Sequence, residues 1–432
     1  MMTTRNRLAA GLFVGIFSLG TLSFAQPQTG FDELYANTAL AAKSPRPAPV
    51  REWTVMAYIN GKNNLSNYAV GDINQMEKVG SSDQVNMVVE AGTMYRPSLP
   101  DAPSLGPMGE PRFGDTAVRR YLIAKDGDAA TINSPVLQEL PGADMGDWEH
   151  LVEFVAWAKS RFPARHYALV VWNHGSGWRS YTRKKTPGKV SSQGISYDDE
   201  TSNHITTVEL GKALAKVAPL DVYAHDACLM QMADVIYEFH KSARVVVGSE
   251  EIEPGEGYAY DSFLRLLVAK PAASAEEVGV MIVDSYAQSM AGHKKGVTLS
   301  AVRADAMPEL QRLVSEWARL AMGLRDSFWL KFAQTNTRRF YDSDYRDLYH
   351  FIRMASDWSE DPALRLKGAE IMRHIDQRVV IKNVALTEKY KEAHGIAIYL
   401  PGGFFSRYYK EYEELAWARE GSWDEFLKRL RR

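Results

Sequence analysis

Two reactive side chains, His174 and Cys228, stand shortly after apolar runs of the sequence. His174 follows the run Tyr167–Trp172 after one residue, and Cys228 follows the run Leu220–Ala224 after His225-Asp226-Ala227. Unbroken apolar runs are typical of strands buried on both faces of a parallel sheet, and functional residues of such sheets lie just past the carboxyl ends of strands. A thiol beside an imidazole can perform nucleophilic catalysis. The spacing therefore indicates a Cys–His site at one edge of a sheet.

The start of the chain predicts export. Arg5 and Arg7 form a short positive region, the apolar run Leu8–Phe24 follows, and small residues around Ala25 fit a signal-peptidase site. We expect residues 1–25 to be a signal peptide, so that the protein is periplasmic or secreted. The alternative is a membrane anchor, but glycine, serine and threonine interrupt this short run. We expect no stable membrane insertion after cleavage.

Cys228 is the only cysteine of the 432 residues, so an exported chain could form no internal disulfide. From the count alone, a buried core cysteine and a catalytic thiol are equally good explanations. The pattern predicts a helix over residues 228–241, and a helix N-terminus lowers the pKa of a thiol. We therefore expect Cys228 to be the nucleophile and His174 its general base. His225 is an alternative base, although it lies very close to Cys228 in sequence.

Strand-like and helical segments alternate along most of the chain, which predicts an α/β/α sandwich around a mostly parallel sheet. We expect a flexible leader over residues 26–52, a catalytic domain over 53–270, and a more helical C-terminal subdomain over 271–432 packed on the sheet. Strands are expected at 53–59, 85–89, 117–123, 167–172, 220–224, 244–248, 296–302 and 395–400. Helices are expected at 66–79, 147–162, 208–217, 228–241, 275–291, 308–323 and 363–377.

The composition excludes several classes of function. A formal net charge of −2 gives no electrostatic basis for binding nucleic acid or an anionic membrane. The hydrophobic share of 45% is that of a folded globular protein. No cysteine or histidine cluster has the spacing of a zinc site. We expect no metal and no organic cofactor.

The sequence around these residues resembles the clostripain family of cysteine peptidases, in the clan that also contains caspases, legumains and gingipains. The paired blocks Asn173–Trp178 and Asp226–Met230 provide most of the resemblance. Supporting blocks are Tyr58–Leu65, Ile195–Asp199 and Ser249–Gly255, with a weaker match at His394–Pro401. The resemblance implies a caspase-like fold, a monomer, and a Cys–His dyad that works without a cofactor.

In that family, the cysteine attacks the scissile carbonyl and the histidine protonates the leaving amine. The resemblance assigns these roles to Cys228 and His174, with the backbone N–H groups of Gly175 and Cys228 as oxyanion donors. It also places Asp226 in the S1 pocket, which predicts a protein or peptide substrate with Arg or Lys at P1. The alternative for Asp226 is a helix N-cap. Further acidic charge comes from Glu250, Glu251, Glu253 and Glu256.

Members of the family are often activated by self-cleavage between the histidine and cysteine blocks. Within this interval, the loop of residues 179–194 has five basic residues that a peptidase of basic specificity could cut after, namely Arg179, Arg183, Lys184, Lys185 and Lys189. The alternative is a solvated basic loop. Self-processing within residues 179–194 is therefore a prediction.

One position departs from the family pattern. Many relatives have an acidic residue before the Asn63-Asn64-Leu65 block, whereas this chain has Lys62. Some relatives respond to calcium, and a lysine here argues against a calcium site in that segment. The acidic run Asp198-Asp199-Glu200 matches no strong cation-binding pattern, and solvated turn residues are expected there.

Two other functions fit part of the pattern. A thiol-dependent amidase would act on a non-protein amide with the same nucleophile. A catalytically inactive binding scaffold would keep the fold alone. Covalent labelling of Cys228 by an arginyl or lysyl electrophile distinguishes the peptidase from the scaffold.

Overall fold

The computed structural model describes residues 49–94, 117–179, 194–325, 328–402 and 408–431. The predicted signal peptide and the leader up to residue 48 lie outside these ranges, as do Arg183, Lys184, Lys185 and Lys189. Residues 48–432 form one compact unit. Within the described ranges, no helix has both the length and the apolar character needed to cross a bilayer.

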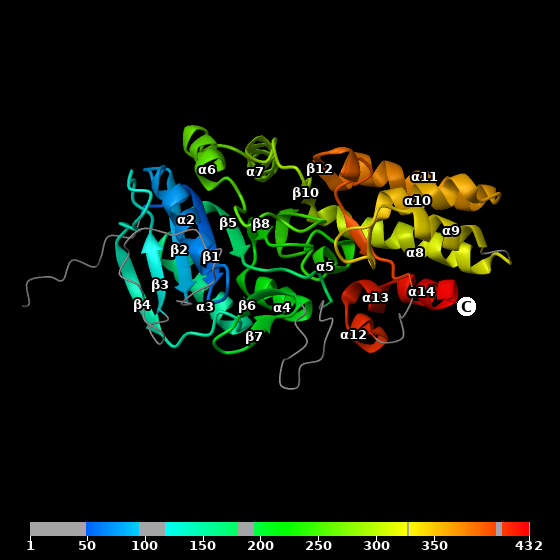
Figure 1. Cartoon of the computed structure of the whole chain (residues 1–432), viewed down its shortest axis with the longest axis horizontal. Coiled ribbons are helices and arrows are strands. Elements are labelled where there is room, and N and C mark those ends of the chain that lie inside the picture. The colour runs from blue at the N-terminus through cyan, green and yellow to red at the C-terminus, as the bar shows by residue number, and fades with distance from the viewer. Residues whose placement is uncertain (1–48, 95–116, 180–193, 326–327, 403–407, 432) are drawn as a thin grey trace, which may run out of the picture. The chain divides into compact units, whose positions relative to one another are not determined.

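A nine-stranded sheet runs through the described part of the chain, in the order β12-β10-β9-β8-β5-β1-β2-β3-β4 (Figure 1). The five central strands are parallel, whereas β10 and β12 at one edge and β3 and β4 at the other are antiparallel. The strands are β1 (Arg51–Gly61), β2 (Val85–Thr93), β3 (Ala117–Leu122), β4 (Val136–Pro141), β5 (Ala164–Trp172), β8 (Leu220–Asp226), β9 (Ala243–Gly248), β10 (Thr298–Arg303) and β12 (Val380–Ala385).

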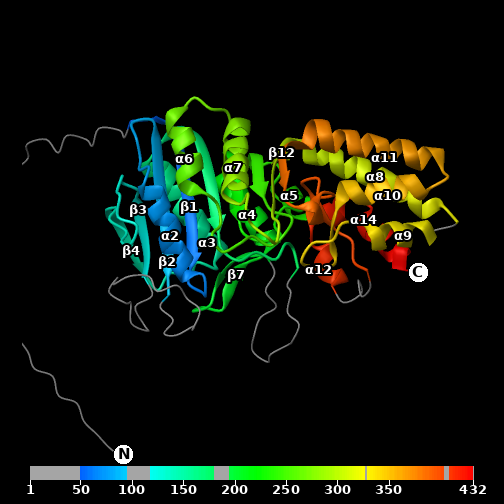
Figure 2. The same ribbon diagram turned by 45° about the horizontal axis from the view of Figure 1, so that its top comes forward.

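Helices cover both faces of this sheet, and each face has its own apolar core (Figures 1 and 2). One core contains α2 (Ser66–Glu77), α6 (Tyr260–Ala269) and α7 (Ala275–Ser289). The other contains α3 (Trp148–Arg161), α4 (Thr207–Val217) and α5 (Ala233–Tyr237). Because the parallel strands are buried on both faces, their sequences are continuous apolar runs. The predicted mostly parallel α/β/α sandwich is confirmed.

The part of the chain after residue 270 contributes both to the sheet and to a helical layer beside it. The helices there are α8 (Met307–Gly323), α9 (Phe328–Asn336), α10 (Leu348–Trp358), α11 (Pro362–His374), α12 (Tyr409–Glu413), α13 (Ala416–Glu420) and α14 (Trp423–Arg431). Strands β11 (Tyr345–Asp347) and β13 (Ala397–Tyr399) pair with each other outside the main sheet. The domain boundary at residue 270 stays a prediction, and β10 and β12 beyond it belong to the central sheet.

One expectation about elements was wrong, and some elements were not predicted. The helix predicted over residues 228–241 is only the short α5, which begins at Ala233. The sequence pattern also gave no sign of β4, whose half-exposed residues lack an apolar run. The backbone after Cys228 is determined by hydrogen bonds to Ser249 and Glu251, and the edge strand β4 by its pairing with β3, so local periodicity predicts neither.

Candidate functional site

The strand order reverses at β1, which lies between β2 on one side and β5 on the other. Ligands of open α/β sheets bind at such a switch point, outside the carboxyl ends of the strands. In the register of the sheet, Ile59 of β1 lies opposite Trp172 of β5, and Trp172 lies opposite Asp226 of β8. The segments after β1, β5 and β8 therefore leave the sheet side by side, and they contain Asn64, His174 and Cys228.

Asparagine side chains fix the first two of these segments. Asn173 donates to the carbonyl of Asn60 and accepts from the Tyr197 N–H at 2.8 Å. Asn63 donates to the Tyr197 carbonyl at 2.8 Å and accepts from the Leu65 N–H at 2.8 Å. Asn60, Asn63 and Asn173 are all buried, so these bonds satisfy polar groups that have no access to solvent. Tyr197 belongs to β6 (Ile195–Asp198), which pairs with β7 (Asn203–Ile205).

His174 contacts Asn64 across this framework. The distance between His174 Nε2 and Asn64 Oδ1 is 2.7 Å. Since an amide oxygen only accepts, this pairing requires a hydrogen on Nε2 and leaves the lone pair on Nδ1. Burial lowers the pKa of His174 below its ordinary value, against an opposing effect of the Asp199 charge. The imidazole is therefore neutral at pH 7, as a general base must be.

The histidine and cysteine segments are in direct contact. A Cβ on Gly175 would overlap the carbonyl oxygen of Cys228 and approach Met230 within 2.9 Å. Only glycine allows the two backbones to come this close. The fold thus places Gly175, the residue after His174, against the backbone of Cys228, and the catalytic roles of His174 and Cys228 stay predictions.

Cys228 lies in a turn and not at a helix N-terminus. Leu229 adopts a positive φ of 64°, which turns the chain away from β8. The N–H groups of Leu229 and Gln231 then donate to the carbonyls of Glu251 and Ser249, at 3.1 and 3.0 Å. The Glu253 N–H donates to the Cys228 sulfur at 3.2 Å.

The electrostatic environment of Cys228 also differs from the expectation. Burial and the charge of Glu253 raise the pKa of the Cys228 thiol to about 12. The expected lowering by a helix dipole was wrong, because the helix begins at Ala233 and acidic groups surround the sulfur. The resting thiol is therefore protonated at neutral pH.

Asp226 is part of a buried acidic cluster below the cysteine. Its carboxylate accepts from the Tyr260 hydroxyl at 2.7 Å and from the Tyr258 N–H at 3.2 Å. Burial raises the pKa of Asp226 to about 6. Burial, together with the charge of Asp226, raises the pKa of both Glu253 and Asp72 well above their ordinary values. Three carboxyl groups thus share one enclosed region, which favours a cationic ligand.

Other candidates named from the sequence lie elsewhere. His225 is fully buried against the rings of Tyr223 and Phe239, and burial lowers its pKa to about 3, so it does not serve as a base for Cys228. Glu250 and Glu251 contact residues of the C-terminal part, since they bond to the Gly395 N–H and the Tyr390 hydroxyl. Of the five processing candidates, Arg179 alone lies in the described residues.

Lys62 occupies a cage of oxygen atoms beside the site. Its ammonium lies 2.9 Å from Asp198 Oδ2, 2.6 Å from Glu200 Oε2 and 2.7 Å from the Ala143 carbonyl. The side chains of Lys62 and Asp198 are 1% and 0% exposed, so this is a buried ion pair. Asp198 is therefore not the solvated residue that we expected, whereas Glu200 lies in an exposed turn as expected. Across the described ranges, no group of three or more ligating side chains could hold a metal ion.

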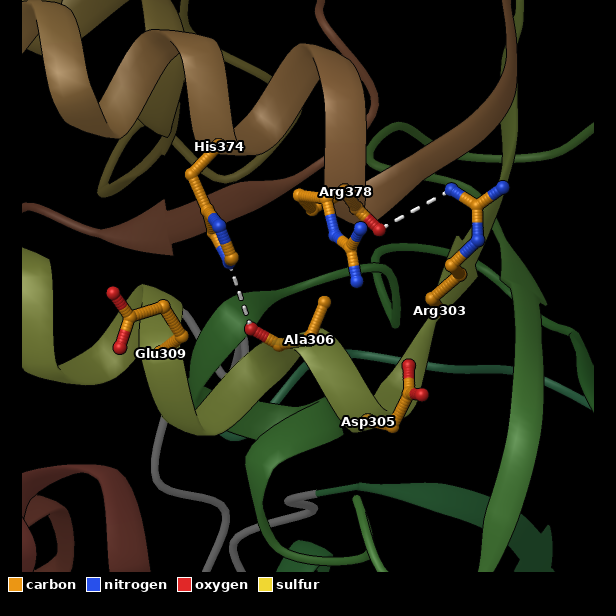
Figure 3. A pocket seen from close by; sticks show the side chains of 6 residues that line it. All are labelled: Arg303, Asp305, Ala306, Glu309, His374 and Arg378. Carbon is orange, nitrogen blue, oxygen red and sulfur yellow. Dashed lines mark hydrogen bonds between the residues drawn. The ribbon is translucent and has the colours of Figure 1, made fainter.

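A pocket of about 290 Å³ lies away from these residues, between the start of α8 and the end of α11 (Figure 3). It is lined by Arg303, Asp305, Ala306, Glu309, His374 and Arg378. His374 Nε2 bonds to the Ala306 carbonyl at 3.0 Å, and Arg303 donates to the Arg378 carbonyl. None of these six residues is a nucleophile, so this pocket is not the candidate catalytic site.

Sequence reasoning assigned no role to Asn64 and none in particular to Glu253. Asn64 was part of a matching block after the first strand, and the strand order now explains its position beside His174. The signal available was that Asn64, like His174, follows a parallel strand at the same edge of the sheet. Glu253 could be recognised only after its loop was seen to pair with the turn that follows Cys228.

Comparison with known proteins identifies the family to which the chain is similar. The sequence model of the clostripain family matches residues 57–429. Clostripain of Hathewaya histolytica is 28% identical over 240 residues, which cover 52% of this chain and 44% of that protein. The chain thus matches less than half the length of this relative.

Solved structures resemble the fold over most of the chain. The X-ray structure of a secreted C11 cysteine protease from Bacteroides thetaiotaomicron, in complex with an irreversible peptide inhibitor, has a TM-score of 0.62 at 19% identity. That of an inactive zymogen C11 protease from Parabacteroides distasonis has a TM-score of 0.63 at 18% identity. Each likeness covers 86% of this chain and 99% of the other.

Proposed function

Because the chain belongs to the clostripain family of cysteine peptidases, we propose that it is an exported endopeptidase that cleaves after Arg or Lys. Cys228 is its nucleophile and His174 its acid–base group. The observation that carries the specificity is the buried cluster of Asp226, Glu253 and Asp72 next to the cysteine. A buried carboxylate group without a permanent cationic partner favours a ligand that brings a positive charge.

The chemistry uses the two side chains in sequence. His174 Nδ1 takes the thiol proton, and the Cys228 sulfur attacks the scissile carbonyl carbon to form a tetrahedral intermediate. The backbone N–H groups of Gly175 and Cys228 stabilise its oxyanion. The C–N bond then breaks as His174 returns the proton to the leaving amine. Water, deprotonated by His174, hydrolyses the thioester, and the departing sulfur regains a proton.

The acidic cluster couples substrate binding to this chemistry. The charge of Glu253 is one reason why the pKa of the Cys228 thiol is raised to about 12, burial being the larger one. A guanidinium or ammonium group in the cluster compensates that charge and lowers the pKa of the thiol. A substrate with basic P1 therefore promotes formation of the thiolate that attacks it, whereas a substrate with neutral P1 does not.

Two further parts of the proposal have separate support. The pattern of residues 1–25 and the secreted relative from Bacteroides thetaiotaomicron support export. The zymogen structure from Parabacteroides distasonis supports activation by processing, which we place between the histidine and cysteine segments. We propose a monomer, because the described sheet is completed by β10 and β12 of the same chain.

Fluorogenic peptides with Arg, Lys, Asp or Leu at P1 test this function, using the chain from Gln26 and its Cys228→Ala and Asp226→Asn variants. We expect hydrolysis after Arg and Lys only, and its loss by about 10⁴-fold or more in Cys228→Ala. Asp226→Asn should lower kcat/KM on the Arg peptide by about 10²-fold. Since Asp226 must be ionised to bind the cation, kcat/KM should rise with pH through about 6.

Other outcomes would identify what is wrong. Cleavage after Asp or Leu would agree with Cys228 as the nucleophile and would reject the acidic cluster around Asp226 as the S1 site. No cleavage of any peptide, before and after mild trypsin treatment, would favour the amidase or the inactive scaffold. Reaction of Cys228 with an arginyl electrophile would then reject the scaffold.

A further inference from the structure

The residues directly after His174 are bound by the C-terminal part of the chain. The Tyr345 hydroxyl accepts from the Arg179 N–H at 3.0 Å and donates to the Ser176 carbonyl at 2.7 Å. Gly177 has a positive φ of 65°, and a Cβ there would lie 2.6 Å from Met232 Sδ and 2.7 Å from the Tyr345 ring. Segment 176–179 thus has no freedom to move unless β11 moves with it.

Arg179 ends this segment in a site built for a guanidinium. Its Nη2 lies 2.8 Å from Asp342 Oδ2 and 2.9 Å from Asp344 Oδ2. Its Cζ lies 4.7 Å from the centre of the Tyr408 ring and 5.6 Å from that of Tyr399. We name Asp342, Asp344, Tyr399 and Tyr408 the arginine clamp.

The clamp is enclosed, which makes its contacts strong. The side chain of Arg179 is 11% exposed and that of Asp342 is 3% exposed. Ion pairs and cation–π contacts gain strength when solvent is excluded, and the separation of a buried pair leaves an uncompensated charge. A peptidase, however, must take the P1 side chain into its own S1 pocket. The peptide bond after Arg179 can therefore be cleaved only if the Arg179 side chain first leaves the clamp.

We infer that Arg179 is the anchored end of the processing interval and not a processing site, and that the clamp holds the His174 segment in place. Of the five basic residues in the predicted processing loop, residues 179–194, four then remain as candidates for cleavage: Arg183, Lys184, Lys185 and Lys189. A cut after any of them leaves the clamp and the Tyr345 contacts intact. The histidine segment consequently keeps its position whether or not the chain has been cut. Arg179 is in this sense a positioning residue.

The first half of this inference can be tested without any activity of the protein. Trypsin also requires a free Arg or Lys side chain, so it can be used on the inactive Cys228→Ala variant. We expect intact-mass analysis to show no cleavage of the Arg179–Ser180 bond in that variant. Adding Asp342→Asn and Asp344→Asn together should make this bond cleavable. Asp284→Asn, which removes an exposed ion pair with Lys382, is the matched control and should leave the bond intact.

Each digestion is run at the same interval below the melting temperature of its variant, which removes the effect of general destabilisation. If the Arg179–Ser180 bond is cleaved as fast in the Cys228→Ala parent as in the variant with Asp342→Asn and Asp344→Asn, Arg179 is not anchored by the clamp. If this bond still resists trypsin after both aspartates are replaced, the clamp is not what protects it.

The second half rests on the proposed peptidase activity. In the active protein, Asp342→Asn and Tyr345→Phe should each lower kcat by about 10-fold and change KM by less than about twofold, since they displace His174 and not the substrate. Unchanged kcat in both variants would overturn the positioning role. If the protein with Cys228 intact has no peptidase activity, the proposed function is wrong. The trypsin experiment would still show whether the clamp anchors Arg179.

Discussion

At the scale of single residues, the contact between Asn64 and His174 decides which ring nitrogen can act. Nε2 donates to the amide oxygen, so in the proposed mechanism proton transfer with Cys228 uses Nδ1. Asn64 itself lies at the surface, where one neutral hydrogen bond contributes about 0.5–1.5 kcal/mol. Its importance therefore lies in the orientation and tautomer of the imidazole more than in stability.

Replacement of Asn64 tests this role. Asn64→Ala should lower kcat by about 10-fold while the melting temperature changes little, because the ring loses its orienting partner. Asn64→Asp should raise the pKa of His174, since a carboxylate favours the imidazolium form, and should shift the acidic limb of the kcat profile to higher pH. Nitrogen-15 NMR of His174 reports the tautomer directly. Asn67→Ala, an exposed asparagine on α2, is the control, and a tautomer unchanged in Asn64→Ala would contradict the assignment.

At the scale of elements, the site depends on the loops that follow β1, β5 and β8, and two kinds of interaction hold these loops. Hydrogen bonds of buried asparagines hold the first two, and backbone pairing with residues 249–251 holds the third. The Lys62 cage joins the end of β1 to the β6–β7 hairpin and to Ala143. The Lys62 ammonium group therefore cross-links three separate segments of the chain.

Removal of this ammonium should destabilise the catalytic half of the protein. Lys62→Met leaves the buried Asp198 charge without its cationic partner, which is expected to cost about 3 kcal/mol of unfolding free energy because three backbone N–H groups still donate to this carboxylate. Denaturant unfolding of the Cys228→Ala background measures this loss without self-cleavage. The control is Lys391→Met, whose exposed pair with Glu388 is screened by solvent and should contribute little to the unfolding free energy. Equal losses in the two variants would show that the Lys62 cage is not a structural cross-link.

The same elements show how far the sequence could predict the structure. The parallel strands and their end residues were predictable because strands buried on both faces have continuous apolar sequences. His174 and Cys228 could be paired for that reason. The turn at Leu229 and the acidic loop around Glu253 could not, since the two segments determine each other's backbone through hydrogen bonds. The raised pKa of Cys228 follows from that packing and from no local pattern.

At the scale of the whole molecule, buried carboxyl groups connect the sheet to the C-terminal part. Glu250, just after β9, accepts from the Gly395 N–H at 3.1 Å, while Asp347 accepts from the His350 N–H at 2.6 Å. Burial, then the charge of Asp347, raises the pKa of Glu250 well above its ordinary value. Burial also raises the pKa of Asp347 to about 6. The folded protein is therefore most stable when at least one of these two carboxyl groups is protonated.

This pair should make the protein less stable as the pH rises. Below the unfolded pKa values of about 4 both states are protonated, and the stabilisation is complete. As the pH rises through 6 and above, the folded state must give up protons that the unfolded state has already lost, so the unfolding free energy falls. Glu250→Gln removes one ionisation and should reduce the fall in melting temperature between pH 5 and pH 8, measured in the Cys228→Ala background. The exposed Glu388→Gln should leave that fall unchanged. If Glu250→Gln has the same pH dependence as its parent, the connection between the sheet and the C-terminal part does not depend on protonation of this pair.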